Sequence, residues 1–361
     1  MEKYRVGIVG ATGMVGQRFI SLLKDHPWFE VNCVAASARS AGKTYREAVG
    51  ERWAFAWEIP EKVAGMTVVD AADIDEVSKH VDFVFCAVDM KKDEIRALEE
   101  AYAKHEIPVV SNNSACRGIE DVPMVVPEIN ADHLAVIEAQ IKRLGTKNGF
   151  IAVKPNCSIQ SYVPALTPLL DFEPEKVSVC TYQAISGAGK TFKTWPEMVD
   201  NVIPYIGGED EKSENEPLKL WGHVEDGKIV NATLPVISAQ CLRVACSDGH
   251  MAAVSVSFKK KPTIEQIKER WANYETEAQR LELPSAPKPF LQYFEDPSRP
   301  QTRLDRDFQN GFGVSIGRLR EDKLFDYRFV CLSHNTVRGA AGGGILTAEL
   351  LCRKGYIPHR V

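Results

Sequence analysis

The sequence of 361 residues contains no CxxC pair, no surplus of basic residues and no long apolar run. Its nine cysteines are scattered, which argues against a disulfide framework or a zinc site and fits a reducing compartment. The formal net charge of -5 argues against a surface for nucleic acid or anionic membrane. No signal-peptide core follows Met1, and no segment is long and apolar enough to span a bilayer. We therefore expect a cytoplasmic protein that binds small molecules and holds no metal.

A glycine turn between a strand pattern and a helix pattern opens the chain. Residues 4–9 form a short apolar run, and residues 14–23 have apolar side chains at helical spacing. Between them, Gly10 can take a tight turn, Gly13 can let backbone N–H groups approach a pyrophosphate, and Gly16 can let the helix pack closely. The motif predicts a dinucleotide site. The alternative is a tight turn of an α/β domain without a ligand.

The pattern of strands and helices then repeats through the first half of the chain. Strands are expected at 30–36, 81–88 and 107–111, with an amphipathic helix at 91–104. Right-handed crossovers would bring the glycine turn and the later strand ends to one edge of a parallel sheet. This half is therefore predicted to be a Rossmann-type, doubly wound α/β domain, and the length of the chain allows a second domain.

The turn after the second strand indicates which dinucleotide is bound. An NAD site usually offers a carboxylate to the ribose there, whereas this chain has Ser37, Arg39, Ser40 and Lys43. Hydroxyl groups and cations suit a 2′-phosphate, so NADP is favoured over NAD. A solvated basic turn is the alternative.

A cysteine marks the start of the second half. Cys157 follows an apolar strand pattern at 150–153 and precedes a helix pattern at 159–170, where a helix N-terminus would favour its thiolate. That effect amounts to less than one pKa unit, so a nearby base is also needed, and His250 is the candidate. Each residue taken alone would more often be an inert core thiol or a satisfied core histidine.

Two further strand patterns accompany this pair. The run 177–185 contains Gln183 and leads into a glycine-rich loop with Ser186 and Gly187, which either approaches a ligand or only connects elements. Residues 251–258 alternate as an antiparallel-type strand that begins at His250, and Arg243 precedes it in a position suited to binding a carboxylate.

Several stretches together resemble the aspartate-semialdehyde dehydrogenase family, over essentially the whole chain. They are residues 10–16, 156–158, 183–189, 243–250 and 335–342, and the turn at 37–43 and the last stretch are most similar to the archaeal and fungal branch. The resemblance implies NADPH-dependent, reversible conversion of L-4-aspartyl phosphate into L-aspartate 4-semialdehyde and phosphate, on the route to lysine, methionine and threonine. The nucleophile would form a thioester, and a histidine with a pKa near neutrality would act as acid and base.

The resemblance also assigns roles to individual residues. Catalysis would use Cys157, His250, Asn156 and Gln183; substrate binding would use Arg243, Arg117, Glu209 and Lys212; cofactor binding would use Gly10, Thr12, Gly13, Met14, Val15, Ser37, Arg39, Ser40, Ser186, Gly187 and Asn335. Glu216 and Lys219 have the same spacing as Glu209 and Lys212, and a solvated charged loop at 207–212 is a third possibility.

The resulting expectation for the whole chain is two domains. Residues 1–155, completed by a C-terminal helix at 336–361, would bind NADP; residues 156–335 would form an α+β catalytic and oligomerisation domain with a mixed sheet. By resemblance, the protein would be a homodimer or homotetramer. Two rival functions are a malonyl-CoA reductase of the same fold and a non-catalytic NADP-binding sensor.

Overall fold

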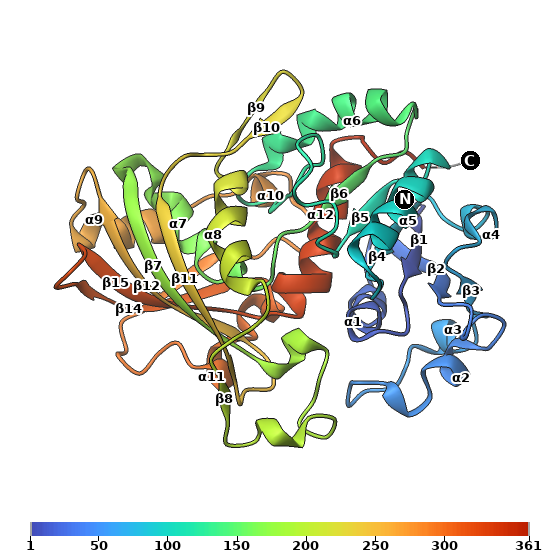
Figure 1. The fold of residues 1–361 in the computed structure, drawn as a ribbon, viewed down its shortest axis with the longest axis horizontal. Coiled ribbons are helices and arrows are strands. Elements are labelled where there is room, and N and C mark those ends of the chain that lie inside the picture. The colour runs from blue at the N-terminus through green and yellow to red at the C-terminus, as the bar shows by residue number, and fades with distance from the viewer. Residues whose placement is uncertain (1, 360–361) are drawn as a thin grey trace.

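The computed structural model describes residues 2–359, and two β-sheets organise them (Figure 1). The first sheet has the order β3-β2-β1-β4-β5-β6, and every pairing in it is parallel. Its strands are β1 Tyr4–Val9, β2 Phe29–Ala36, β3 Val69–Asp70, β4 Phe83–Cys86, β5 Val109–Ser111 and β6 Ile151–Val153. This is the doubly wound order predicted for the first half, and it reverses between β1 and β4.

Short helices connect these strands, as expected for a doubly wound sheet. They are α1 Met14–Leu23, α2 Tyr45–Val49, α3 Glu61–Ala64, α4 Ile74–Ser78, α5 Lys92–Lys104 and α6 Ile137–Leu144. The bounds of β1 and α1 match the sequence pattern, because a largely apolar run and a helical repeat adjoin there with glycines between them. In the described part of the chain, no helix is long and apolar enough to cross a membrane.

The second sheet is mixed and has the order β13-β14-β15-β12-β7-β11-β8. Its strands are β7 Pro174–Gln183, β8 Val202–Ile203, β11 Val236–Val244, β12 His250–Phe258, β13 Leu291–Phe294, β14 Val314–Glu321 and β15 Tyr327–Ser333. A separate hairpin pairs β9 His223–Glu225 with β10 Lys228–Val230. As predicted from its alternating pattern, β12 runs antiparallel to both neighbours, β7 and β15.

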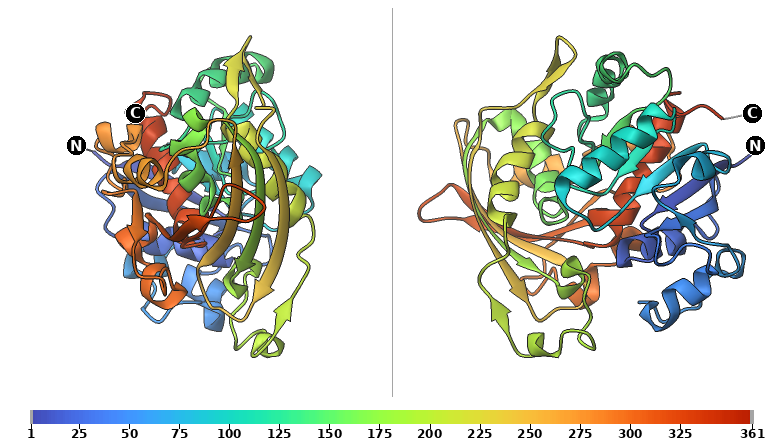
Figure 2. Two further views of the ribbon diagram at one scale, coloured as in Figure 1. Left: turned by 90° about the vertical axis from the view of Figure 1, so that its left-hand side faces the viewer. Right: turned by 45° about the vertical axis from the view of Figure 1, so that its right-hand side comes forward.

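One face of the second sheet packs on helices, and the two views of Figure 2 show how strongly this sheet curves. The helices of this half are α7 Val163–Leu166, α8 Glu209–Leu220, α9 Ile264–Ala272, α10 Glu277–Arg280 and α11 Thr302–Asp305. Buried side chains of β7 and β12 share one core with Tyr162, Leu166 and Trp271. The two faces therefore differ, since Tyr182 on β7 is 37% exposed on the opposite side.

The C-terminal helix α12 Gly342–Arg353 returns to the first sheet, as the sequence led us to expect. Its apolar side chains, including Ile345 and Leu350, share a core with β1, β4 and α1. Gly344 allows the close approach, because a β-carbon there would lie 2.9 Å from Cζ of Phe19 on α1. The chain therefore crosses between the two sheets more than once, and the buried ion pair of Arg338 with Glu128 ties the last crossing to the first half.

Two predicted helices differ from the structure. The run 159–170 is not one helix but the 3₁₀ turn Ser158–Gln160, the short α7 and the 3₁₀ turn Thr167–Phe172. Pro164 and Pro168 explain this, because proline lacks the N–H of a continuous helix. The last helix begins at Gly342 instead of residue 336, since residues 337–341 form an irregular π-type turn in which Ala340 is not helical.

Candidate functional site

The glycine turn between β1 and α1 is shaped by contacts that exclude side chains. Gly10 has a φ of +90°, and a β-carbon there would lie 2.3 Å from the carbonyl oxygen of Ala87. A β-carbon at Gly16 would lie 2.3 Å from the carbonyl oxygen of Gly10. At Gly13, by contrast, an added β-carbon would have its nearest neighbour, the carbonyl oxygen of Gly10, at 3.5 Å. Gly13 is the N-cap of α1 and supplies no side-chain hydrogen bond to the helix. The turn therefore leaves the helix N-terminus open to an anion such as a pyrophosphate.

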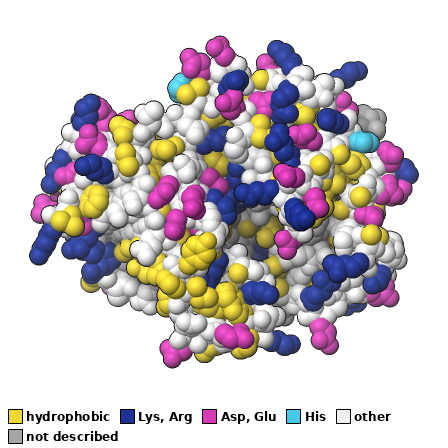
Figure 3. Space-filling model, viewed as in Figure 1, with side chains coloured by type: hydrophobic (Ala, Val, Ile, Leu, Met, Phe, Trp, Pro, Cys, Tyr) yellow, Lys and Arg dark blue, Asp and Glu magenta, His cyan; other side chains and the backbone are white. Residues whose placement is uncertain are grey.

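A cleft of about 470 Å³ lies beside this turn. One wall comes from the start of α1 with Thr12 and Met14, and the other from the loop after β7 with Gly189 and Lys190. An adjoining cavity of about 160 Å³ is lined by Arg18, Ser186 and Thr336. Figure 3 shows a hollow near the centre of this face, between the parts of the molecule built on the two sheets.

The turn after β2 has free polar groups. Ser37 and Arg39 are exposed, and Ser40 closes the turn by donating its N–H to the carbonyl of Ser37 at 2.8 Å. Arg39 makes no ion pair with any carboxylate in residues 2–359. A guanidinium with no ion-pair partner in the described residues, next to two serines in the chain, suits a phosphate ester.

Cys157 lies in the loop after β6 and is held by close packing. A β-carbon at Gly339 would lie 2.9 Å from the Cβ of Cys157, so the irregular turn before α12 covers the loop that carries Cys157. Burial, followed by the charge of Glu209, raises the pKa of the Cys157 thiol, while Lys154, Arg243 and Arg117 act in the opposite direction. The expected help from a helix N-terminus was wrong, because only a three-residue 3₁₀ turn follows the cysteine.

Asn156 is fixed by hydrogen bonds on both sides of its amide. Its Oδ1 accepts the backbone N–H and the hydroxyl of Ser158, both at 2.7 Å. Its Nδ2 donates to the two carboxylate oxygens of Glu209 at 2.9 and 3.1 Å. The amide group is therefore rigid, and its donors point to the carboxylate in this state of the protein.

His250 begins β12 and is fully buried. Its Nδ1 accepts the backbone N–H of Ala184 at 3.0 Å, so the neutral ring carries its proton on Nε2. Nε2 is buried without a hydrogen-bond partner in the described residues. Burial first, and then the charge of Arg243, hold the pKa of His250 well below its usual value. A pKa near neutrality was expected, and the dry position of the ring accounts for the difference.

Gly187 brings the histidine and Arg243 together. A β-carbon at Gly187 would lie 2.8 Å from Nη1 of Arg243 and 3.0 Å from Nε2 of His250. Arg243 is paired in register with Gln183 on the neighbouring strand β7, and its Nη1 donates to the carbonyl of Ala184 at 2.8 Å. The glycine loop after β7 therefore packs directly against the two candidate polar groups.

The charged stretch after Gly208 forms the helix α8, not a solvated loop. Glu209 accepts from Nζ of Lys212 at 2.8 Å and from Nε2 of Gln183 at 3.2 Å. About two helical turns further along, Glu216 pairs with Nη1 of Arg117 at 2.9 Å. The helix thus brings two carboxylates to the site.

The ammonium group of Lys219 is fully occupied by hydrogen bonds to the backbone. Its Nζ donates to three backbone carbonyl groups, those of Arg117, Ile119 and Val122, at 2.7 to 3.0 Å. All three ammonium protons have acceptors. Of the two pairs that share a spacing, Glu209 and Lys212 therefore have the arrangement suited to a ligand, and Lys212 remains partly exposed.

Asn335 joins the two ends of the site. Its Nδ2 donates to the hydroxyl of Ser186 at 2.8 Å, and its Oδ1 accepts the N–H of Gly249 at 2.7 Å. Because Gly249 precedes His250, one amide group connects the loop after β7, the start of β12 and the turn after β15.

Two family models match the chain: "Semialdehyde dehydrogenase, NAD binding domain" over residues 5–137 and "Semialdehyde dehydrogenase, dimerisation domain" over residues 166–338. The aspartate-semialdehyde dehydrogenase of Schizosaccharomyces pombe is 45% identical over 98% of this chain and 99% of its own length. That of Archaeoglobus fulgidus is 43% identical over 98% and 100%. The chain belongs to the aspartate-semialdehyde dehydrogenase family. The resemblance to archaeal and fungal members is thereby confirmed.

Solved structures of this family agree in fold. The aspartate-semialdehyde dehydrogenase of Candida albicans, solved with NADP, has a TM-score of 0.89 and 39% identity, and the alignment covers 99% of this chain and 100% of that one. A Vibrio cholerae structure aligns with a TM-score of 0.74 at 24% identity, which supports the fold alone. This dehydrogenase is therefore an oxidoreductase with a Rossmann-type nucleotide-binding half and a mixed-sheet half, as predicted.

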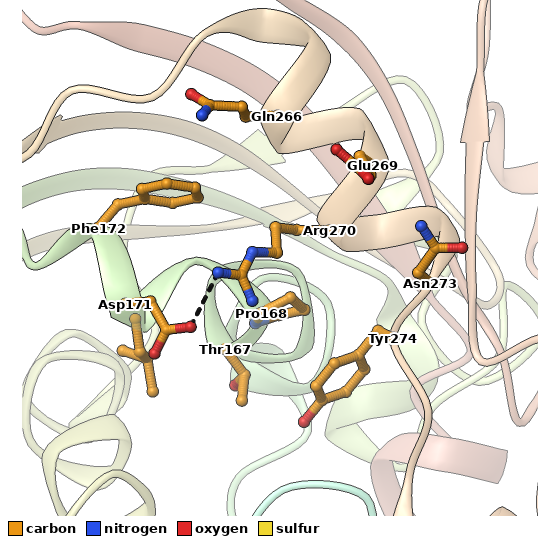
Figure 4. Close-up of a pocket in the computed structure, with 10 residues that line it drawn as sticks. Thr167, Pro168, Asp171, Phe172, Gln266, Glu269, Arg270, Asn273 and Tyr274 are labelled. Carbon is orange, nitrogen blue, oxygen red and sulfur yellow. Dashed lines mark ion pairs between the residues drawn. The ribbon is translucent and has the colours of Figure 1, made fainter.

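A cavity of about 740 Å³ lies away from these residues (Figure 4). Residues 167–172 and the helix α9 line it, with Arg270 paired to Asp171 at 3.0 Å across an open surface. None of the predicted site residues contributes to its walls. Its size therefore does not make it a competing candidate for the active site.

Sequence reasoning missed three residues of the site. Gly339 packs on Cys157, Arg18 lines the adjoining cavity of about 160 Å³ with its Nε buried and without a hydrogen-bond partner, and Lys154 is buried at the start of the loop that carries Cys157. Arg18 lies one helical turn after Met14 on α1, a spacing that could have indicated the cleft-facing side of that helix. Lys154 gave no signal, because a lysine before proline at the end of a strand usually lies at the surface.

Proposed function

We propose that this aspartate-semialdehyde dehydrogenase converts L-4-aspartyl phosphate and NADPH reversibly into L-aspartate 4-semialdehyde, phosphate and NADP through a thioester on Cys157. One observation carries the proposal: Glu209 links Asn156 of the nucleophile loop to Gln183 of β7, while Arg243 and His250 converge on Gly187 just beyond Gln183. The loop that carries Cys157, a carboxylate, a guanidinium and an imidazole are thereby gathered in one partly buried place.

The bond changes at Cys157 follow from thiol chemistry. The thiolate attacks the acyl carbon, the bond from that carbon to the phosphate oxygen breaks, and phosphate leaves with its electron pair. The thioester that remains is electrophilic enough to be reduced. When bound, the nicotinamide supplies the hydride in this direction and accepts it in the other. Expulsion of the thiolate from the reduced carbon releases the aldehyde and restores the free cysteine.

His250 would stabilise the negative charge that develops on the acyl oxygen. With Nδ1 engaged by Ala184, Nε2 carries a proton and has no partner in the described protein. It is thus ready to donate a hydrogen bond to an oxyanion, a contribution worth roughly a hundredfold in rate. Action as an acid or base toward the thiol additionally requires the ring to give up its bond from Ala184.

The charged side chains match a substrate that carries both signs. Arg243 would bind the α-carboxylate, Glu209 the amino group, and Arg117 with Lys212 the phosphate, while Gln183 and Asn156 orient the reacting group. The ion pairs of Arg117 with Glu216 and of Lys212 with Glu209 support these roles, because each carboxylate holds its cation in place beside the site.

NADP is the cofactor that the nucleotide half suits. The open N-terminus of α1 offers backbone N–H groups to the pyrophosphate, with Gly10, Thr12, Gly13, Met14 and Val15 around it. Ser37, Arg39 and Ser40 would hold the 2′-phosphate, while Ser186, Gly187 and Asn335 would contact the nicotinamide end. The NADP-bound Candida albicans relative supports this choice over NAD.

The chain-level proposals follow from these roles. Residues 1–155 with 336–361 would form the NADP-binding domain, and residues 156–335 the catalytic and oligomerisation domain. We place the enzyme in the cytoplasm, on the route to lysine, methionine and threonine. A homodimer or homotetramer would form through an apolar strip on the exposed side of the second sheet, which comprises Tyr182, Val199, Val202, Tyr205, Leu234 and Val236.

A direct assay tests the reaction. Purified wild type and Cys157→Ala are given aspartate semialdehyde, NADP and phosphate, and NADPH formation is followed by absorbance. We expect phosphate-dependent turnover in the wild type and none in Cys157→Ala, which should still bind NADP. Reduction of malonyl-CoA without turnover of aspartate semialdehyde would favour the malonyl-CoA reductase, and NADP binding without any turnover would favour the sensor.

A further inference from the structure

Lys154 is a buried amine that the proposed reaction does not use. Its side chain is 1% exposed, and its Nζ has a single hydrogen-bond acceptor, the carbonyl of Pro155. No carboxylate among residues 2–359 forms an ion pair with it. Lys219 shows the contrast, since three carbonyl groups saturate its buried ammonium. An ammonium left largely unsatisfied in a dry site is costly and calls for a compensating partner.

The groups around Lys154 are those of the candidate active site. Cys157 is three residues away in the same loop, Arg117 follows β5, and Glu209 and Glu216 lie on α8; all four act electrostatically on the amine. Its charge also acts on His250 of β12. Gly343 at the start of α12 also packs against Lys154, since a β-carbon at Gly343 would lie 3.7 Å from Cε of the lysine.

We infer that Lys154 is a positioning residue that places a buried positive charge next to Cys157 and thereby stabilises the thiolate needed for attack. This inference rests on the proposed role of Cys157 as the nucleophile. It accounts for the unsaturated ammonium, whose missing partner is the thiolate itself. It also replaces the continuous helix N-terminus that the sequence suggested as the source of thiolate stabilisation and that the structure lacks.

The coupling of the two groups is reciprocal. Burial, followed by the charge of Arg117, lowers the pKa of Lys154 to about 7, while an anion at Cys157 raises it. Burial raises the pKa of Cys157, and the cation at 154 lowers it. Loss of the thiol proton therefore favours the ammonium, and the pair titrates as a unit. The fixed cations Arg117 and Arg243 stay in place when Lys154 is changed, so the effect of Lys154 can be measured by itself.

The test measures how fast iodoacetamide, a neutral reagent, alkylates Cys157 between pH 5.5 and 9.5, with the modified peptide quantified by mass spectrometry. In Lys154→Met we expect the midpoint of the pH profile to rise and the rate at pH 7 to fall about tenfold or more. Lys154→Arg keeps a charge and should have a midpoint at or below that of the wild type. Lys268→Met, which removes a half-buried lysine paired with Glu295 outside the candidate site, is the charge-matched control and should behave as the wild type.

The pH profiles of the Lys154 variants distinguish an electrostatic role of this lysine from a structural one. An unchanged midpoint in Lys154→Met that melts as a folded protein and binds NADP would overturn the inference. A purely structural role predicts loss of stability without a shifted midpoint. If Lys154→Met does not fold, Lys154→Arg decides, because a midpoint above that of the wild type would contradict a role for positive charge. Activity that survives in Cys157→Ala would refute the proposed thioester, whereas an unshifted profile with an inactive Cys157→Ala would refute only the role of Lys154.

Discussion

Ala184 donates its backbone N–H to Nδ1 of His250 at a distance of 3.0 Å. This hydrogen bond determines the tautomer of the ring and also disfavours its protonation. A protonated ring would carry hydrogen on both nitrogens, so Nδ1–H would face the N–H of Ala184. The bond and the burial of the ring therefore both favour the neutral form in the folded protein, in agreement with the lowered pKa of His250.

We expect the buried neutral histidine to make folding sensitive to acid. In the unfolded chain the imidazole takes up a proton below about pH 6.5, whereas the folded ring resists protonation, so the unfolded state binds more protons. The stabilising contribution is present above pH 6.5 and is lost as the pH falls, by up to about 1.4 kcal/mol per pH unit. Urea unfolding of the wild type and of His250→Asn between pH 7.5 and 5.5 measures the difference in slope.

His359 provides the control for that experiment, because it is exposed and forms no ion pair in the described residues. The variant His359→Asn shows how far the slope changes when an exposed histidine is removed. Equal slopes for His250→Asn and the wild type would mean that the folded ring accepts a proton as readily as the unfolded one.

Gly187→Ala should impair catalysis with little effect on stability. The added carbon would lie within 3.0 Å of both Arg243 and His250, so the ends of these side chains must move, while the backbone conformation at 187 accepts alanine. If His250 and Arg243 have the proposed roles of oxyanion donor and carboxylate-binding cation, their displacement lowers kcat/KM by roughly a hundredfold or more. Steady-state kinetics and melting temperature are compared with those of Gly65→Ala, where a β-carbon meets nothing within 4 Å. Near-normal kcat/KM in Gly187→Ala would contradict the packing described above.

Arg39→Ala should weaken the use of NADPH selectively. Arg39 is exposed and unpaired in the described structure, so its removal leaves the fold intact and takes away one charge from the proposed phosphate site. We expect the KM for NADPH to rise about tenfold, as for a lost charge-assisted hydrogen bond, and the KM for NADH to stay unchanged. Arg46→Ala removes an arginine at a surface ion pair nearby and serves as the control. A parallel rise for both cofactors would mean that Arg39 does not recognise the 2′-phosphate.

The elements with one dominant pattern could be predicted from the sequence, and those that depend on distant partners could not. The strand β1 and the helix α1 have a clear apolar period, and their bounds came out as expected. The stretch 209–220 is highly charged and contains Pro217, which favours a loop. It is helical because tertiary contacts support it, among them the bond from the Tyr162 hydroxyl to the carbonyl of Ser213 at 2.6 Å.

The site residues could be predicted from the sequence, but the contacts that determine their chemistry could not. Residue types in recurring motifs pointed to Cys157, Arg243 and His250, and the structure places the last two on either side of one glycine. Sequence gives no access to the hydrogen bond from Ala184 or to the burial of Lys154, because both arise from chain segments that meet only in the folded state. The expected near-neutral pKa of the histidine was wrong for that reason.

The apolar strip on the second sheet leads to the last prediction. Val202 and Tyr205 are 54% and 70% exposed near the edge strand β8, and Figure 3 shows hydrophobic side chains gathered in this region of the surface. A patch of this kind on a chain that matches a dimerisation-domain model is best covered by a second copy. Val202→Glu should therefore shift the protein toward the monomer in sedimentation-velocity experiments. A buried, unpaired charge at such an interface costs several kcal/mol, enough to raise the dissociation constant by about a hundredfold or more.

Leu324→Glu is the control for the strip, because Leu324 is 90% exposed in the turn between β14 and β15 and lies outside it. That variant should sediment as the wild type at every concentration. If Val202→Glu also does so, the copies must meet through another surface. If both variants dissociate, the added charge acts through the net charge of the chain and not through a local contact, and the strip loses its special role. Dissociation of Val202→Glu alone, with an unchanged melting temperature of the monomer, is the result that the exposed apolar side of the sheet predicts.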